Sequence, residues 1–170
     1  MFYLTKRLLM RPAWPEDWRA VLAAVGHRHI IRNLARAPWP YGEAEAREWL
    51  AHQPDPAYPR FLLIDRRSGG GALIGSAGFA PDEEGPEIGY WIAEEYWNRG
   101  YASEAACALV EIARVIGHSK LVSGHFVDNP ASGAVLRKAG FSPTGAIRTR
   151  DSAGRGETVD CVMYARQDAR

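Results

Sequence analysis

The early part of the chain spaces its apolar residues as helices do. Four apolar side chains at positions i, i+3, i+4 and i+7 predict an amphipathic helix over residues 16–26. The same kind of pattern predicts a shorter helix over residues 43–52, which ends before a group of prolines. Residues 27–41 follow no clear period, and residues 4–11 read as an extended segment. This part of the chain therefore predicts one strand followed by two helices.

The apolar period shortens after residue 60, where short runs of strand-forming residues are separated by turn-forming ones. The predicted elements are strands over residues 61–65, 72–80 and 87–93, a long helix between Gly100 and Gly117, a strand over 121–126, a helix over 130–140, and strands over 141–150 and 157–166. The whole order is β-α-α-β-β-β-α-β-α-β-β. It favours one α+β domain over residues 1–170, with helices flanking a mixed, largely antiparallel sheet.

The charge balance excludes some classes of function. The chain has 21 Lys and Arg against 20 Asp and Glu, for a net charge of +1, so it lacks the basic surplus of a general nucleic-acid binder. Lys and Arg interrupt the apolar residues at the N-terminus, where no stretch approaches the roughly 20 apolar residues that cross a bilayer. We therefore expect neither a nucleic acid nor a membrane as a partner.

The cysteines and histidines point to no metal centre and no disulfide. Cys107 and Cys161 form no CxxC pair, and two free thiols fit a protein of the reducing cytoplasm. His27 and His29 have no third ligand at a suitable spacing. We expect a cytoplasmic protein without a bound metal.

The turn before the long helix has the features of an anion site. The first N–H groups of a helix have no partner within it and lie at the positive end of its dipole, which suits a phosphate. Gly100 lets the backbone approach a ligand closely, and the side chains of Ala102 and Ser103 are small. Taken alone, the segment is equally consistent with Gly100 as an ordinary turn residue.

Residues 97–102 read Trp-Asn-Arg-Gly-Tyr-Ala. They resemble a motif of the GNAT family of acyl-CoA-dependent N-acetyltransferases, which has Gln or Arg first, Gly fourth, and Gly or Ala last. Trp97 departs from the usual Gln or Arg. The strings TKRLLMRP, IGYWI and NPASGAVLRKAGF resemble, in the same order, the branch of the ribosomal-protein N-terminal (alanine/serine) acetyltransferases. The resemblance covers essentially the whole chain.

This resemblance implies a GNAT fold and acetyl-CoA as co-substrate, with direct attack of a primary amine on the thioester. The branch points to a protein N-terminal amine as acceptor. A small amine, such as a polyamine or an antibiotic, remains an alternative, and so does a module that binds acyl-CoA without chemistry. The acceptor would face residues 26–41, which carry no readable specificity pattern. The expected assembly is a monomer or a homodimer.

The resemblance also implies which residues hold the co-substrate. The pyrophosphate would lie on backbone N–H groups of the loop, and the peptide-like pantetheine arm would pair with the end of the third meander strand. That strand, 87–93, would splay from the parallel strand 121–126. Asn129 would contact the arm and also cap the following helix. The implied cofactor-binding residues are Trp91, Ile92, Ala93, Asn98, Arg99, Gly100, Tyr101, Ala102, Ser103 and Asn129.

Two further residues are the candidates for proton transfer. An amine is mostly protonated at neutral pH and must lose a proton before it attacks, so a general base is needed. Glu87 begins its strand where many family members place a catalytic glutamate. Leu136 stands where many relatives carry a tyrosine acid, and Ser132 is the candidate substitute. Ser132 is equally consistent with a polar residue in the first turn of a helix, with water or no acid serving instead.

Overall fold

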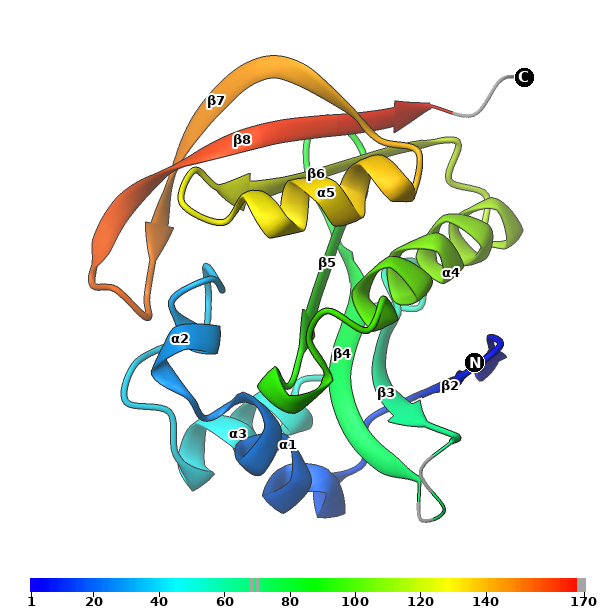
Figure 1. Ribbon diagram of the computed structural model, residues 1–170, viewed down its shortest axis with the longest axis vertical. Coiled ribbons are helices and arrows are strands. Elements are labelled where there is room, and N and C mark those ends of the chain that lie inside the picture. Colours follow the sequence, from blue (N-terminus) through cyan, green and yellow to red (C-terminus); the bar gives the residue numbers. More distant parts are fainter. Residues whose placement is uncertain (68, 70, 168–170) are drawn as a thin grey trace.

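A single mixed sheet organises the protein (Figure 1). The computed structural model describes residues 1–67, 69 and 71–167, and within them eight strands lie in the order β1-β2-β3-β4-β5-β6-β8-β7. All neighbouring strands are antiparallel except β5 and β6. The strands are β1 (Tyr3–Leu4), β2 (Leu8–Arg11), β3 (Arg60–Asp65), β4 (Ala72–Ala80), β5 (Glu87–Ile92), β6 (Lys120–Phe126), β7 (Ser142–Ser152) and β8 (Glu157–Gln167).

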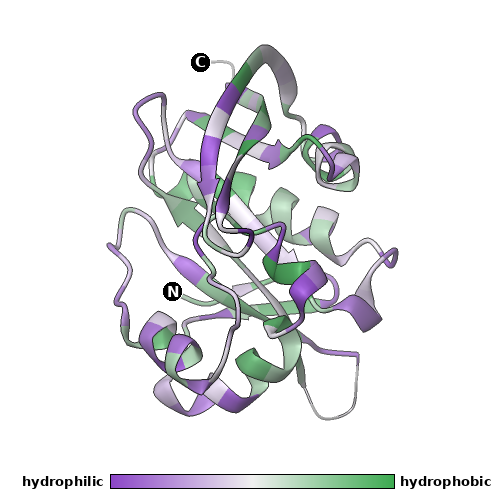
Figure 2. Ribbon diagram, turned by 90° about the vertical axis from the view of Figure 1, so that its left-hand side faces the viewer, coloured by the Kyte–Doolittle hydropathy of each residue, from purple (hydrophilic) through white to green (hydrophobic). Residues whose placement is uncertain are grey.

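Helices cover both faces of the sheet because strand residues alternate between its two sides. The helices are α1 (Trp18–Val25), α2 (Arg28–Ile31), α3 (Glu43–Ala51), α4 (Tyr101–Val115) and α5 (Pro130–Lys138). On β3, Phe61 and Leu63 pack in a core with α4 and α5, whereas Leu62 and Ile64 pack in a second core with α1 to α3. Figure 2 shows hydrophobic residues concentrated on the central strands and hydrophilic ones on the outer segments.

The parallel strands β5 and β6 part soon after they begin. Their pairing has one register position, Glu87 opposite Val122, next to a bond of 3.0 Å from the Val122 N–H to the Pro86 carbonyl oxygen. One residue further along, the Ser123 hydroxyl donates to the Ile88 carbonyl oxygen over 2.9 Å. Beyond this point the strands diverge and leave a notch in the sheet (Figure 1). The predicted splay of these two segments is therefore present.

The predicted class, a mixed and largely antiparallel sheet flanked by helices, is confirmed, and two segments differ in detail. The extended segment 4–11 is two short strands, because a turn closed by the Thr5 N–H and the Leu8 carbonyl oxygen folds β2 back on β1. Residues 27–41 contain α2, whose two isoleucines are buried. The sequence also predicts a glycine-rich turn over residues 66–71, between the strands 61–65 and 72–80, and residues 68 and 70 of it lie outside the described residues. So do residues 168–170 of the domain predicted over 1–170, and that assignment stays a prediction.

Candidate active site

A cleft of about 1660 Å³ runs through the notch between β5 and β6. Its walls come from α1 to α3 on one side and from the loop before α4, the start of α4, and α5 on the other. The cleft brings together most of the residues predicted from the sequence, namely Glu87, Trp91, Ile92, Asn98, Gly100, Tyr101, Ala102, Ser103, Asn129 and Ser132. Ala93 and Arg99 are the two predicted residues that do not line it.

Residues of β5 alternate between those that hydrogen-bond to β4 and those whose backbone groups face the notch. The Ala93 N–H donates to the Ile74 carbonyl oxygen of the β4 side over 2.8 Å. Bonded and non-bonded pairs alternate in an antiparallel ladder, so the backbone groups of Trp91 also point toward β4. Those of Tyr90 and Ile92 point into the notch, in phase with the Ile88 carbonyl oxygen that Ser123 contacts. The positions for a strand-like ligand therefore belong to Tyr90 and Ile92 rather than to Trp91.

The side chain of Trp97, which departs from the family motif, makes a specific contact with the end of β5. Its indole Nε1 donates to the Ile92 carbonyl oxygen over 2.7 Å, and its ring packs nearly perpendicular to that of His29 at a centroid distance of 5.6 Å. The Ala93 carbonyl oxygen is likewise engaged, by the Tyr96 N–H at 2.9 Å. The end of β5 is thus fixed to the following loop, and the Tyr90 groups and the Ile92 N–H are left to face a ligand.

The loop before α4 has the geometry expected of an anion site. Asn98 and Gly100 both adopt positive φ angles, of 59° and 78°, which turn the backbone sharply into the helix. The N–H groups of Tyr101, Ala102 and Ser103 occupy the first turn of α4 and have no helical partner. They lie at the positive end of a 15-residue helix and line the cleft. These groups fit a pyrophosphate.

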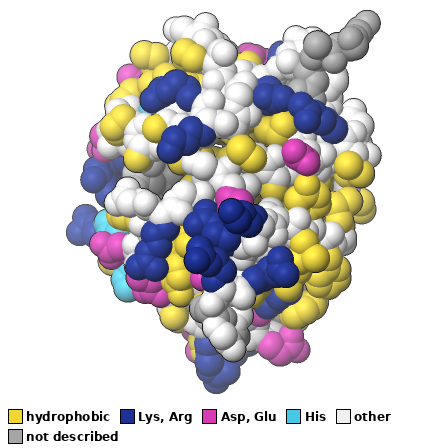
Figure 3. Space-filling view, turned by 45° about the vertical axis from the view of Figure 1, so that its right-hand side comes forward, with side chains coloured by type: hydrophobic (Ala, Val, Ile, Leu, Met, Phe, Trp, Pro, Cys, Tyr) yellow, Lys and Arg dark blue, Asp and Glu magenta, His cyan; other side chains and the backbone are white. Residues whose placement is uncertain are grey.

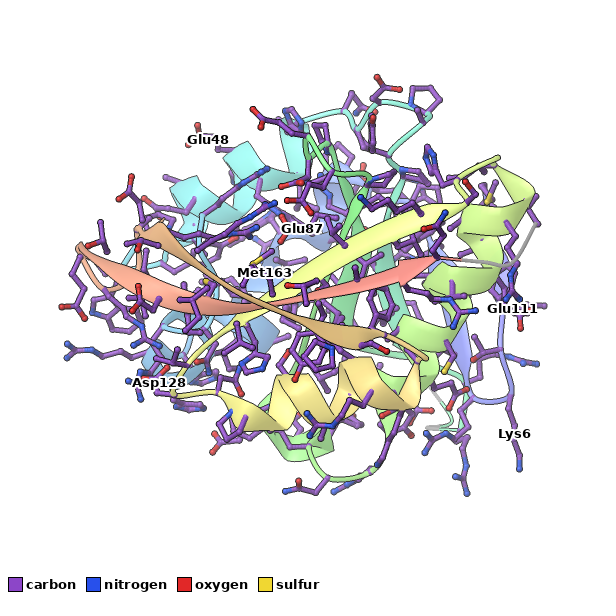
Figure 4. All side chains as sticks on the ribbon, turned by 90° about the horizontal axis from the view of Figure 1, so that it is seen from above. Lys6, Glu48, Glu87, Glu111, Asp128 and Met163 are labelled. Carbon is purple, nitrogen blue, oxygen red and sulfur yellow. The ribbon has the colours of Figure 1, made fainter. Side chains whose placement is uncertain are left out.

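Glu87 lies on the opposite side of the sheet from this loop's helix. Side chains alternate along β5, so Glu87 and Trp91 face α1 to α3 whereas Tyr90 faces α5. Figure 4 shows Glu87 on the side of β6 away from α5. Its carboxylate pairs with Arg150 of β7 at 2.5 Å and is about one-sixth exposed (17%). Beside it, a Cβ on Gly89 would meet nothing within 4 Å, so an amine has room to approach.

Ser132 meets Tyr90, a residue within the quoted IGYWI string whose role the sequence did not reveal. The Tyr90 hydroxyl donates to the Ser132 carbonyl oxygen over 3.1 Å, and the two hydroxyl oxygens share a hydrogen bond of 2.9 Å. Burial raises the pKa of Tyr90 to about 12, so its hydroxyl remains a donor at neutral pH. Leu136 is fully buried in the core, consistent with the prediction that it supplies no acid.

Asn129 occupies the N-cap position of α5, but its side chain makes no capping hydrogen bond. Asn129 thus holds the predicted N-cap position, and the Ser132 N–H of the first turn donates to its backbone carbonyl oxygen over 3.2 Å instead of to its side chain. Since Asn129 lines the cleft, its amide is available to a ligand there.

A bridge of charged residues joins the segment after α2 to the turn between β7 and β8. Asp128 accepts hydrogen bonds from Arg32, after α2, at 2.8 Å and from Arg155, in the β7–β8 turn, at 2.9 Å. The hydrogen bonds from Arg155 in particular lower the pKa of Asp128. The Ala153 N–H also donates to the Ala35 carbonyl oxygen over 2.9 Å. The hairpin tip is thereby tied to the segment 27–41, as its position beside α2 in Figure 1 indicates.

The described residues contain neither a candidate metal-binding cluster nor a candidate membrane-spanning helix. Among them, no His, Cys, Asp and Glu side chains gather in a group of three or more that could hold a metal ion. Within the same residues, no helix combines the length and the apolar character needed to cross a membrane.

A family model described as an acetyltransferase (GNAT) domain matches residues 7–142. This match covers the notch between β5 and β6, the loop before α4, which we call the anion loop, and α5. The chain belongs to the GNAT acetyltransferase family. The match includes every predicted catalytic and cofactor-binding residue and ends where β7 begins.

Relatives and solved structures agree with this family. The chain is 28% identical to the N-acetyltransferase YnaD of Bacillus subtilis over 151 residues, which cover 87% of this chain and 86% of YnaD. It is 39% identical to YoaA of the same organism over 80 residues, and spans only 45% of the length of that relative. A GNAT-family acetyltransferase from Bacillus anthracis superposes with a TM-score of 0.84 at 25% identity over 98% of both chains.

A further solved structure shares the fold of this GNAT protein. RimL, the ribosomal L7/L12 alpha-N-protein acetyltransferase, solved in complex with coenzyme A, superposes with a TM-score of 0.79 at 24% identity over 98% of both chains. At this identity the likeness shows a common fold.

Proposed function

We propose that this GNAT protein transfers the acetyl group of acetyl-CoA to a primary amine, and that the amine is a protein N-terminus. The observation that carries the proposal is the notch itself. Backbone groups of Tyr90 and Ile92 face it, and it leads to the unpaired N–H groups at the start of α4. A ligand with a peptide-like arm and a pyrophosphate fits both features.

The proposed chemistry divides the proton transfers between the two sides of the sheet. Glu87, on the α1 to α3 side, takes a proton from the amine, whose nitrogen attacks the thioester carbonyl carbon. The new C–N bond forms and the C–S bond breaks, which releases a thiolate toward α5. There the hydroxyl of Ser132, whose oxygen lies 2.9 Å from the Tyr90 hydroxyl, donates a hydrogen bond to the departing sulfur. The acetyl group passes directly between the two substrates.

Direct transfer is favoured because the one cysteine in the cleft is a poor nucleophile. Cys161 lines the cleft but is only 3% exposed. Burial, the largest influence, raises the pKa of its thiol, so the reactive thiolate is scarce at neutral pH. The chemistry therefore needs no acetyl-cysteine intermediate.

The acceptor class is tested by measuring release of the CoA thiol with a panel of amines. We expect turnover with a peptide whose N-terminal residue is serine or alanine, and none with the same peptide after its α-amine is blocked, even when it contains lysine. A polyamine and an aminoglycoside form the small-molecule arm. Turnover confined to that arm would refute the N-terminal acceptor but keep the transferase, and acetyl-CoA binding without turnover on any amine would leave only a binding module.

Removing the hydroxyl of Ser132 is expected to slow turnover by about one to two powers of ten. This is the order of one transition-state hydrogen bond, roughly 1.4 to 2.7 kcal/mol. Because Tyr90 contacts Ser132 through its own hydroxyl, Tyr90→Phe is expected to cost about tenfold, and the double variant little more than Ser132→Ala alone. Steady-state rates at saturating acetyl-CoA measure this. Unchanged turnover in Ser132→Ala would make the serine a helix-start residue only.

A further inference from the structure

Arg7 connects the N-terminal segment to the anion loop, which lies 92 residues further along the chain. Its Nη1 donates to the carbonyl oxygen of Arg99 over 2.8 Å, and its guanidinium carbon lies 4.1 Å from the centre of the Tyr101 ring. Its Nε donates to Glu104 over 2.6 Å. One side chain thus contacts the loop, the first residue of α4 and the first turn of that helix. Figure 3 shows many Lys and Arg side chains on this side of the molecule.

The ion pair between Arg7 and Glu104 matters for anion binding because Glu104 is itself negatively charged. Burial opposes ionisation of Glu104, but hydrogen bonds from Thr5 and Arg7 outweigh it and lower the pKa of Glu104. The side chain is therefore a carboxylate at neutral pH, in the same helical turn as the N–H groups that line the cleft. Its Oε1 accepts from the Thr5 hydroxyl at 2.5 Å and from the Arg7 N–H at 2.8 Å. With the guanidinium on Oε2, both carboxylate oxygens are engaged by donors of the N-terminal segment.

We propose that Arg7 is a positioning residue for the anion loop. It holds the Arg99 carbonyl so that the neighbouring N–H groups face the pyrophosphate of acetyl-CoA, and it neutralises Glu104, whose charge otherwise repels that anion. Arg7 is not among the residues that line the cleft, so it acts through the loop and not on the reacting atoms. The inference rests on the proposed function, because it takes acetyl-CoA as the ligand.

The test compares Arg7→Met with a matched control, Arg11→Met. Arg11 also pairs with a carboxylate, Asp17, at 2.7 Å and stacks on an aromatic ring, Trp14, at 4.0 Å, but it contacts no part of the loop. Both variants lose a similar ion pair. We expect Arg7→Met to weaken acetyl-CoA binding about tenfold by calorimetry and to raise its KM while kcat holds, and Arg11→Met to leave both within twofold.

Two further measurements separate positioning from general damage. With S-acetylpantetheine, which lacks the pyrophosphate, kcat/KM should differ less than twofold between the parent and Arg7→Met. Adding Glu104→Gln to Arg7→Met should recover at least threefold in acetyl-CoA affinity, since it removes the carboxylate charge that Arg7 no longer neutralises. Arg7→Lys, which keeps a charge beside Glu104, tests the same idea if Arg7→Met does not fold, with an expected loss of about threefold.

The outcomes distinguish this inference from the proposed function. If the parent protein fails to bind acetyl-CoA, the proposed function falls. If the parent binds it and Arg7→Met or Arg7→Lys binds equally well, only the positioning role falls. An equal loss with S-acetylpantetheine, or no recovery on adding Glu104→Gln, would also overturn the role and leave the transferase intact.

Discussion

The Glu87→Gln variant is expected to turn over roughly 10² to 10⁴ times more slowly than the parent, the usual range for losing a positioned proton acceptor. Glutamine keeps the size of the side chain and a hydrogen bond from Arg150 but cannot take a proton from the amine. The affinity for acetyl-CoA should hardly change, because Glu87 faces α1 to α3, across the sheet from α4, whose first turn is proposed to hold the pyrophosphate. Initial rates of thiol release, with the acceptor identified by the amine panel, measure the effect.

The pH dependence of this loss identifies its cause. The fraction of neutral amine falls as the pH falls, so the need for a base grows, and the loss in Glu87→Gln should be largest at low pH. Glu84→Gln is the control, because Glu84 also pairs with an arginine, Arg148, but does not line the cleft. It should keep nearly full turnover. Undiminished turnover of Glu87→Gln over the whole pH range would transfer the role to water or to another carboxylate.

A valine at Gly100 is expected to abolish the thermal stabilisation that acetyl-CoA gives the parent. At a hundredfold excess over its dissociation constant, a ligand stabilises the folded state by about 2.7 kcal/mol, which appears as a higher Tm. Gly100 has a φ of 78°, and a β-branched residue there both strains the backbone, by roughly 1–2 kcal/mol, and crowds the N–H groups. Thermal unfolding with and without millimolar acetyl-CoA measures the shift.

The matched control for this variant lies at the other end of the same helix. Gly117 also has a positive φ, of 90°, and a Cβ there would meet nothing within 4 Å. Gly117→Val should therefore lower the Tm by a similar strain yet keep the full shift on adding acetyl-CoA. If acetyl-CoA fails to stabilise the parent at millimolar concentration, or stabilises Gly100→Val equally, the assignment of the loop is wrong.

Local patterns in the sequence predicted the helices, strands and turns, but not the side-chain contacts between residues far apart along the chain. Helix periodicity and the glycine at the start of α4 predicted an anion site in the loop before that helix, and the family resemblance, together with the strand pattern, pointed to Glu87. The contacts of Arg7 with Glu104 and of Tyr90 with Ser132 join residues 97 and 42 positions apart. No local pattern encodes such pairs, because the sheet brings them together only after folding. Trp97 likewise shows as a departure in the motif, and its bond to Ile92 appears only in three dimensions.

The notch between β5 and β6 also bears on how the protein avoids association with other chains. Unpaired backbone groups along a strand are a template on which foreign strands add, and proteins usually protect them. Here the open backbone groups of Tyr90 and the Ile92 N–H face the notch between β5 and β6, in the interior of the strand order rather than at an outer edge of the sheet. A foreign strand would have to add inside the sheet, between two strands already present. These groups are therefore less open to edge-to-edge association than those of the outer strands β1 and β7.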